Sequence, residues 1–317
     1  MKKYSSVIVT GSMAYDEIMD FPGYFKDYLQ PDKLHQINVS FVLDKIEKQL
    51  GGTATNITYN IHLALGQTNI PLILLGAVGK DGIDFINFFK KNNCNTSQII
   101  IDKKLYTATG KVITDKNDNQ IWGFYYGASK LAVKHNLKKF IRKDTFVVIS
   151  ANHPQPFLHF QKQAISLKLD YLYDPGMSLT WIKNSDLKKG VTNCQFLVGN
   201  DYEISSIYKR LKINEKVLIK KGVNVITTLG GLGVNFECVE KNKYKKYFIP
   251  AYKLKKIIDP TGAGDAWRGG FIAGLLKDYS IVDSLKLGNV VASFAIESYG
   301  TINHHPTQSE IKRRLKF

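Results

Sequence analysis

The chain has few cysteines and no long apolar run. Its 317 residues include three cysteines, Cys94, Cys194 and Cys238, which are far apart and odd in number. They indicate neither a disulfide framework nor a CxxC metal site. No apolar stretch approaches the roughly 18 residues of a membrane helix, and the first residues lack the apolar block of a signal peptide. We therefore expect a cytoplasmic protein that makes no disulfides and enters no membrane.

Arginine is scarce in a strongly basic chain. Only five of its 44 basic residues are arginine, although the formal net charge is +17. Contacts to base edges and bidentate contacts to phosphates favour arginine, so this composition argues against a nucleic-acid partner. The lysines are spread along the chain, as on a solvated surface. Their positive field can also attract a small polyanion such as a nucleotide.

Three common phosphate-binding signatures are missing. A Walker A loop is absent because Asp81 follows Gly79-Lys80 where Ser or Thr is required. The dinucleotide pattern GxGxxG fails because Trp267 stands where the third glycine after Gly262 and Gly264 belongs. Protein-kinase HRD and DFG motifs are also missing. Any phosphate loop in this chain must belong to another architecture.

Strand and helix patterns alternate along the chain. Residues 4–9 alternate as a β-branched strand, and residues 70–78 form a continuous apolar run typical of a strand buried on both faces. Further strands are expected at 146–150, 169–173, 195–198 and 223–229, and C-terminal helices at 261–277, 281–298 and 307–316. This alternation predicts a three-layer α/β fold with a mainly parallel central sheet. Because no linker-like stretch is present, we expect one domain over residues 1–317.

Two segments interrupt this alternation. Residues 34–43 and 105–127 have strand patterns without helices, and the second folds back at a polar turn around 116–119. We expect a small β-sheet, built from about residues 15–48 and 104–128, that leaves the main body and returns. A lid over a binding site is one interpretation, and an edge extension or dimer surface is the other. A monomer and a homodimer formed through this sheet both remain open.

The segment DPTGAGDAWRGGF, residues 259–271, carries the clearest chemistry. Gly262, Ala263 and Gly264 precede a helix pattern, and unpaired N–H groups at a helix start bind anionic oxygens. Asp265 would repel a phosphate, so it makes sense as a base for a hydroxyl that attacks phosphorus. A helix N-cap is its alternative role. We give Arg268 no catalytic role and expect it on the surface or near phosphate.

Four ordered motifs resemble the ribokinase-like, or PfkB-type, family of carbohydrate and nucleoside kinases. The segment DPTGAGD is similar to the family's C-terminal signature, and Gly51-Gly52 with Asn56 is similar to its N-terminal one. Asn200 to Glu203 resembles its NxxE motif, and residues 228–233 (TLGGLG) resemble its phosphate-contacting turn. Within the family, the chain looks most similar to bacterial adenosine kinases.

The resemblance implies a ribokinase-like fold and phosphoryl transfer from ATP to the 5′-hydroxyl of a nucleoside, with adenosine as the expected acceptor. A sugar kinase of the ribose or fructose type is the alternative, and an idle binding protein on the same scaffold is a third. Asp265 would be the base, and the amides of Gly262, Ala263, Gly264 and Asp265 would form the anion hole.

The resemblance also assigns binding residues. Asp16, expected at the end of the first strand, would hold sugar hydroxyls. The expected substrate contacts are Ser12, Asp16, Asn38, Gly52, Asn56 and Phe124, and the expected ATP contacts are Asn200, Thr228, Gly230, Gly233 and Asn289. Asn200 and Glu203 would hold Mg²⁺ through water, and Asp259 would mark a weaker site for K⁺. Capping, turn formation and packing are the alternative roles of these residues.

Overall fold

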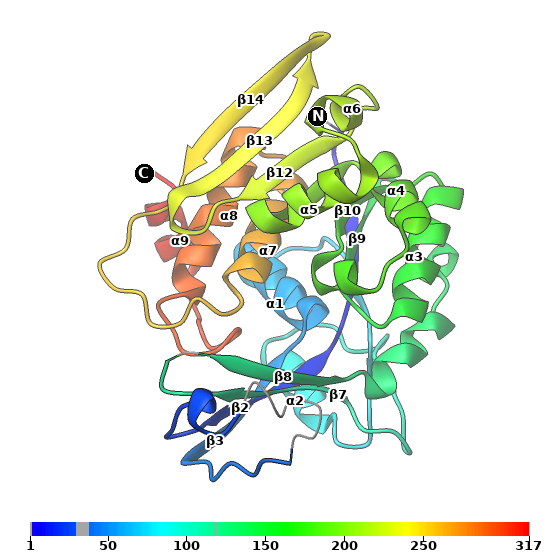
Figure 1. Cartoon of the computed structure of the whole chain (residues 1–317). Coiled ribbons are helices and arrows are strands. Elements are labelled where there is room, and N and C mark those ends of the chain that lie inside the picture. The colour runs from blue at the N-terminus through cyan, green and yellow to red at the C-terminus, as the bar shows by residue number, and fades with distance from the viewer. Residues whose placement is uncertain (1, 30–37, 118, 317) are drawn as a thin grey trace.

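The computed structural model describes residues 2–29, 38–117 and 119–316. Figure 1 shows helices on both faces of a large twisted sheet and a small sheet across one end of it. The α-helices are α1 (Thr53–Leu65), α2 (Ile83–Lys91), α3 (Pro154–Ser166), α4 (Asn184–Asn193), α5 (Asp201–Leu211), α6 (Glu215–Ile219), α7 (Ala263–Leu276), α8 (Ile281–Ala295) and α9 (Gln308–Arg314). Short 3₁₀ helices span Phe25–Asp27, Gly127–Lys134, Leu137–Lys139, Gly176–Thr180 and Gly230–Leu232.

The strands form one large and two smaller sheets. They are β1 (Ser6–Thr10), β2 (Ala14–Asp20), β3 (Lys45–Gly51), β4 (Leu72–Leu75), β5 (Ala77–Val78), β6 (Ile100–Ile101), β7 (Ala108–Thr114), β8 (Gln120–Tyr125), β9 (Thr145–Ser150), β10 (Asp170–Asp174), β11 (Phe196–Asn200), β12 (Asn224–Thr228), β13 (Gly233–Glu240) and β14 (Lys243–Pro250). The large sheet has the order β14-β13-β12-β11-β10-β9-β1-β4. Its strands pair in parallel from β4 to β12, and β13 and β14 add an antiparallel hairpin that projects from the body in Figure 1.

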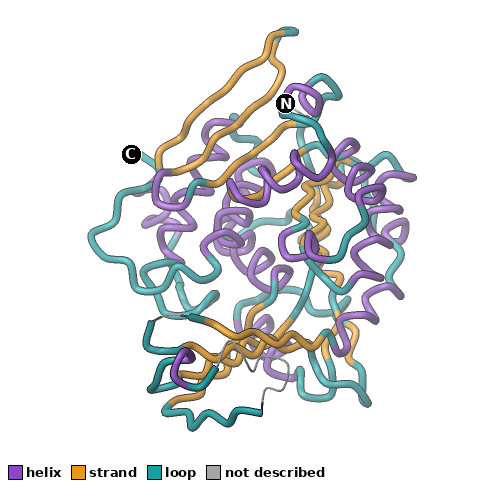
Figure 2. Tube along the Cα trace, viewed as in Figure 1, coloured by secondary structure: helices purple, strands orange, loops and turns teal. Residues whose placement is uncertain are grey.

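Successive residues of β1 enter two different cores. Val7 and Val9 pack in the core that includes α1, α7 and α8, whereas Ile8 packs in the core of α3, α4 and α5. Since side chains of a strand alternate between the faces of its sheet, helices must cover both faces. Figure 2 shows these helices flanking the strands. The predicted three-layer α/β fold with a mainly parallel sheet is confirmed.

The small sheet is built from two distant segments, in the order β3-β2-β7-β8. Strand β2 pairs with β7 in parallel and with β3 antiparallel, and β7 and β8 form the expected hairpin. It lies beneath the carboxyl ends of the large sheet's parallel strands in Figure 1. Because β7 ends at Thr114 and β8 begins at Gln120, the chain turns between them, and the turn predicted near 116–119 is confirmed for its described residues.

The strand expected at 34–43 is wrong where the structure describes it. Residues 38–43 are loop, and residues 34–37 lie outside the described part of the chain. The apolar side chain of Phe41 packs against Phe21, Phe25 and Tyr28, with ring centroids 4.7, 5.3 and 5.7 Å away. An aromatic cluster, rather than a sheet, accounts for the apolar pattern.

The apolar run at 70–78 is interrupted. β4 ends at Leu75 and β5 begins at Ala77, and Leu72 and Ile73 are only partly buried because β4 is an edge strand. The expectation that both faces are buried is therefore wrong for Leu72 and Ile73.

Within the described ranges, no helix has both the length and the apolar character needed to cross a bilayer.

Candidate active site

The anion loop, residues 259–265, enters α7 through a glycine. Gly262 is the N-cap with φ 77° and ψ −4°, a left-handed conformation that disfavours other residues. A Cβ at this position would also lie 2.8 Å from Cβ of Thr301. No side chain caps α7, although the Ala263 amide donates to the carbonyl of Pro260 at 3.2 Å, so an anion can take the place of a cap at the other amides of the first turn.

The first cavity, which we call the acceptor cavity, lies between the small sheet and the carboxyl ends of the parallel strands. Its volume is about 740 Å³. It collects most of the residues predicted from the sequence: Ser12, Asp16, Gly52, Asn56, Phe124, Asn200, Glu203, Thr228, Gly230, Gly262, Gly264 and Asp265. Trp122 and Met177 add apolar surface, and Asp174 and Arg268 add charge.

A second cavity of about 490 Å³, the donor-side cavity, adjoins the first. Thr228, Gly230 and Gly264 line both cavities, so the two meet at the anion loop. Gly233, Ala263 and Asn289 line the second cavity and not the first. The Asn289 side chain accepts a hydrogen bond from Trp267 Nε1 at 2.8 Å and donates to the carbonyl of Pro250 at 2.7 Å. It therefore fixes this wall through protein contacts.

Asp265 is held by residues from distant segments. Its Oδ2 accepts a hydrogen bond from Nδ2 of Asn56 at 2.8 Å. Burial raises the pKa of Asp265 to about 6, against the lowering effects of the Arg268 charge and the Asn56 hydrogen bond. The charges of Asp16 and Glu203 act in the same direction as burial. A carboxylate with this pKa is ionised near neutral pH and still accepts a proton readily.

Asp16 reaches the cavity from a different strand than expected. The chain leaves β1 at Thr10, and Asp16 lies within β2 of the small sheet, so its expected place at the end of the first strand is wrong. The turn at residues 11–13 redirects the backbone before Asp16 is reached. Burial raises the pKa of Asp16 to about 6. Its carboxylate faces the same cavity as Asp265.

Asn200 and Glu203 cap α5 and also line the acceptor cavity. Asn200 Oδ1 accepts from the Glu203 amide, and Glu203 Oε2 accepts from the Asn200 amide, both at 2.8 Å. The alternative role as a capping box is thus present. Among the described residues, no group of three or more His, Cys, Asp or Glu side chains is arranged to hold a metal ion. A cation here would need most of its ligands from water or a bound phosphate.

Comparisons with known proteins identify the family. Residues 12–308 match the model of the pfkB family carbohydrate kinases. The chain belongs to the pfkB family.

Three relatives illustrate the match to this family. A nucleoside kinase of Methanocaldococcus jannaschii is 29% identical over 293 residues, covering 92% of this chain and 93% of the relative. Its solved structure, described as an archaeal member of the ribokinase family, has a TM-score of 0.82 at 28% identity and covers 100% of this chain and 99% of that one. A Burkholderia thailandensis nucleoside kinase in complex with ADP-inosine has a TM-score of 0.82 at 25% identity, covering 98% and 95%. A ribokinase of Lactococcus lactis is 28% identical over 252 residues, covering 77% of this chain and 79% of the relative.

Arg268 of this pfkB kinase was expected on the surface or near phosphate. It is only 6% exposed, so the surface interpretation is wrong, and the place near phosphate stays a prediction. Its Nε lies 2.6 Å from Oδ2 of Asp174, and its Nη2 donates to Oδ1 of Asp174 at 2.9 Å. Asp174 was missed altogether. Its position at the end of a predicted strand was the available signal, because ligands bind at the carboxyl ends of such strands.

Two predicted residues lie outside both cavities. Asn38 is exposed and lines neither of them. Asp259 is buried, and its two carboxylate oxygens accept from the amides of Thr261 at 2.8 Å and Gly300 at 2.9 Å. In this kinase Asp259 therefore ties the anion loop to the loop at Gly300.

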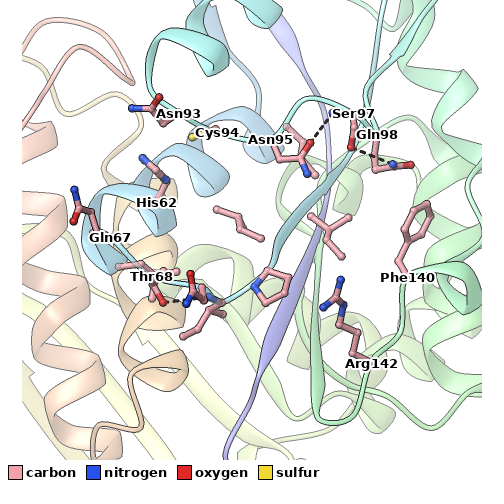
Figure 3. Close-up of a pocket in the computed structure, with 18 residues that line it drawn as sticks. His62, Gln67, Thr68, Asn93, Cys94, Asn95, Ser97, Gln98, Phe140 and Arg142 are labelled. Carbon is pink, nitrogen blue, oxygen red and sulfur yellow. Dashed lines mark hydrogen bonds between the residues drawn. The ribbon is translucent and has the colours of Figure 1, made fainter.

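A separate cavity of about 740 Å³ opens at the other end of the kinase's parallel strands. Figure 3 shows His62, Gln67, Asn95 and Arg142 around it. Its lining includes the segments that lead into β4 and β9, whereas the lining of the acceptor cavity includes segments that follow β1, β9, β10, β11 and β12. None of the residues predicted as site residues lines it.

Proposed function

We propose that this kinase transfers the γ-phosphoryl group of ATP to the 5′-hydroxyl of a nucleoside, with adenosine as the acceptor. The observation that carries the proposal is the pair of cavities that meet at the anion loop, with Asp265 facing the larger one. This arrangement suits two substrates whose reacting ends must approach each other. The nucleoside kinases of M. jannaschii and B. thailandensis support a nucleoside acceptor.

In the proposed reaction the 5′-oxygen forms a bond to the γ-phosphorus while the bond from that phosphorus to the β,γ-bridging oxygen breaks. ADP leaves with the bridging oxygen, and the hydroxyl proton passes to the Asp265 carboxylate. Asn56 orients that carboxylate through the 2.8 Å hydrogen bond to its Oδ2. The amides at the start of α7 stabilise the charge on the transferring group, as preorganised N–H donors do in other phosphoryl and acyl transfers.

The acceptor cavity offers separate places for a sugar and a base. The Asp16 carboxylate can accept hydrogen bonds from two neighbouring hydroxyls of a ribose. Trp122, Phe124 and Met177 supply apolar surface, and Trp122 and Met177 are 56% and 53% exposed in this structure. Aromatic rings of this kind stack on a nucleobase, whereas a free sugar leaves them uncovered. We propose that the small sheet acts as a lid that excludes water.

Glu203 and Asn200 are the proposed Mg²⁺ residues, acting through water. Their side chains are oxygen donors on the cavity wall, which fits a hard cation that keeps its waters, and the described residues offer no full set of protein ligands. When bound, Mg²⁺ neutralises phosphate charge. The K⁺ site beside Asp259 stays a prediction, because both oxygens of that carboxylate already accept backbone hydrogen bonds. Comparing the reaction rate with and without K⁺ tests it.

The test is ADP formation from Mg-ATP with adenosine, inosine, guanosine, cytidine, ribose and fructose as separate acceptors. We expect turnover with adenosine and little with either sugar. Turnover with ribose or fructose alone would replace the acceptor and favour the ribokinase-type activity that the L. lactis relative represents. No turnover with any of the six would remove the proposed function.

A further inference from the structure

Arg268 places a buried positive charge inside the acceptor cavity. Its side chain is 8% exposed and that of its partner Asp174 is 4% exposed. Among the described residues that line this cavity, Arg268 is the single Lys or Arg. The other charged side chains there are the carboxylates of Asp16, Asp174, Glu203 and Asp265.

The guanidinium group is held on one side and open on the other. Nε and Nη2 face the Asp174 carboxylate at 2.6 and 2.9 Å. Nη1 lies on the side of the anion loop, 2.9 Å from the point that a Cβ on Gly264 would occupy. Gly264 lines both cavities, and Arg268 itself lines the acceptor cavity, so Nη1 lies beside a residue that the two cavities share. Within the described ranges, the side-chain hydrogen bond of Arg268 is the one from Nη2 to Asp174.

A purely structural role explains this arrangement poorly. A buried ion pair adds little net stability, because desolvation of the two charges offsets most of their attraction. Arg268 also follows Asp265 by three residues on α7, so both side chains project from one face of the helix. A role in stability alone therefore does not explain why the Arg268 side chain lies beside the anion loop.

We propose that Nη1 of Arg268 contacts the γ-phosphoryl group of the bound nucleotide before and during transfer, and that Asp174 is the positioning residue that aims it. The proposal rests on the proposed function for the identity of the donor. A guanidinium group is always charged and matches phosphate oxygens with its planar donors. An arginine that stabilises the transferring phosphoryl group accelerates such reactions by about 10³–10⁵-fold.

The test uses a double variant, because Arg268 alone cannot be neutralised without leaving Asp174 buried and unpaired. Arg268→Gln with Asp174→Asn removes both charges together. The matched control, Lys2→Gln with Asp170→Asn, removes the exposed 2.9 Å ion pair at the other end of β10. Calorimetry measures the dissociation constants of ADP and of the β,γ-imido analogue of ATP with Mg²⁺. Circular dichroism and the melting temperature establish folding.

We expect the folded double variant to bind ADP with a dissociation constant within about threefold of the original value. The ratio of its affinity for the analogue to its affinity for ADP should fall by about tenfold or more, as when a charged hydrogen bond is lost. The control should keep that preference. An unchanged preference in the double variant overturns the proposal, whether or not any acceptor is turned over. Turnover gives a second test of the proposal. It is overturned if kcat of the double variant is within threefold of the original value, or if a higher pH restores kcat to that value. Failure of the proposed function shows separately, as the original protein's inactivity with every acceptor.

Discussion

Asn56 donates a hydrogen bond from Nδ2 to Oδ2 of Asp265 over 2.8 Å, although the two residues are 209 positions apart. Asn56 is in turn fixed by Thr301, whose hydroxyl donates to Asn56 Oδ1 at 2.9 Å. Three distant segments therefore set the direction of one carboxylate. Because Asn56 and Thr301 are both buried, the direction is a property of the fold and needs no ligand.

Asn56→Ala should lower kcat by about 10–100-fold, the effect of losing one hydrogen bond to a charged group. The hydrogen bond from Asn56 lowers the pKa of Asp265, so the variant should also need a higher pH for full activity. The measurement is kcat across pH 5 to 9. Thr301→Val should show a smaller loss in the same direction, and Thr301→Ser, which keeps the hydroxyl, should show little. Equal effects of both Thr301 variants would contradict this chain of contacts.

Activity should fall as the pH drops through about 6. Burial raises the pKa of both Asp265 and Asp16 to about 6, and a base must be ionised to accept a proton. Both carboxylates must be ionised in the proposed reaction, Asp265 to accept the proton and Asp16 to hold the sugar hydroxyls, so the acid limb of log kcat/KM against pH should reach a slope above one. In Asp16→Asn the slope should fall to one. A flat profile between pH 5 and 8 would contradict the assignment of Asp265.

Gly262→Ala should lower the free energy of unfolding by about 1–3 kcal/mol, because alanine is strained at a φ of 77°. Its Cβ would also press on Thr301 at 2.8 Å. Gly231→Ala is the matched control, since no atom lies within 4 Å of the added Cβ. Urea unfolding measures both, and turnover should fall in the first variant alone. Equal stability of the two variants would mean that the anion loop tolerates another backbone conformation.

Trp122→Ala should raise the KM for adenosine by about tenfold or more, as expected when a base loses one aromatic partner. Tyr125→Ala is the control: it alters an exposed aromatic residue of β8 that does not line the acceptor cavity. Initial rates at saturating ATP give both KM values. If the two variants behave alike, Trp122 has no special contact with the base.

The main body could be predicted because its strands carry local patterns. Buried β-branched runs such as that of β9, followed by helices, indicate a parallel sheet without knowledge of any contact. The small sheet was harder. β3 reads KIEKQLG, a polar sequence that forms a strand only through its pairing with β2. The hairpin of β13 and β14 was missed, although Lys241 and Asn242, both at positive φ, mark its turn.

The candidate site was predictable where one short segment carries it. The anion loop and its base lie within residues 259–265, and their spacing alone indicates phosphate chemistry. The ion pair of Asp174 and Arg268 joins residues 94 positions apart, so no local pattern reveals it. The same holds for the contact of Asn56 with Asp265. Such contacts depend on how α7 packs beside the sheet.

The most direct measurement compares the original protein with Asp265→Asn, which removes the base and keeps the shape of the side chain. Formation of AMP from adenosine and Mg-ATP is followed by chromatography, and adenosine binding by calorimetry. We expect AMP from the original protein, a rate about 10²–10⁴-fold lower in the variant, and adenosine affinity unchanged within about threefold. A variant that forms AMP at the original rate would contradict the account of Asp265 as the base.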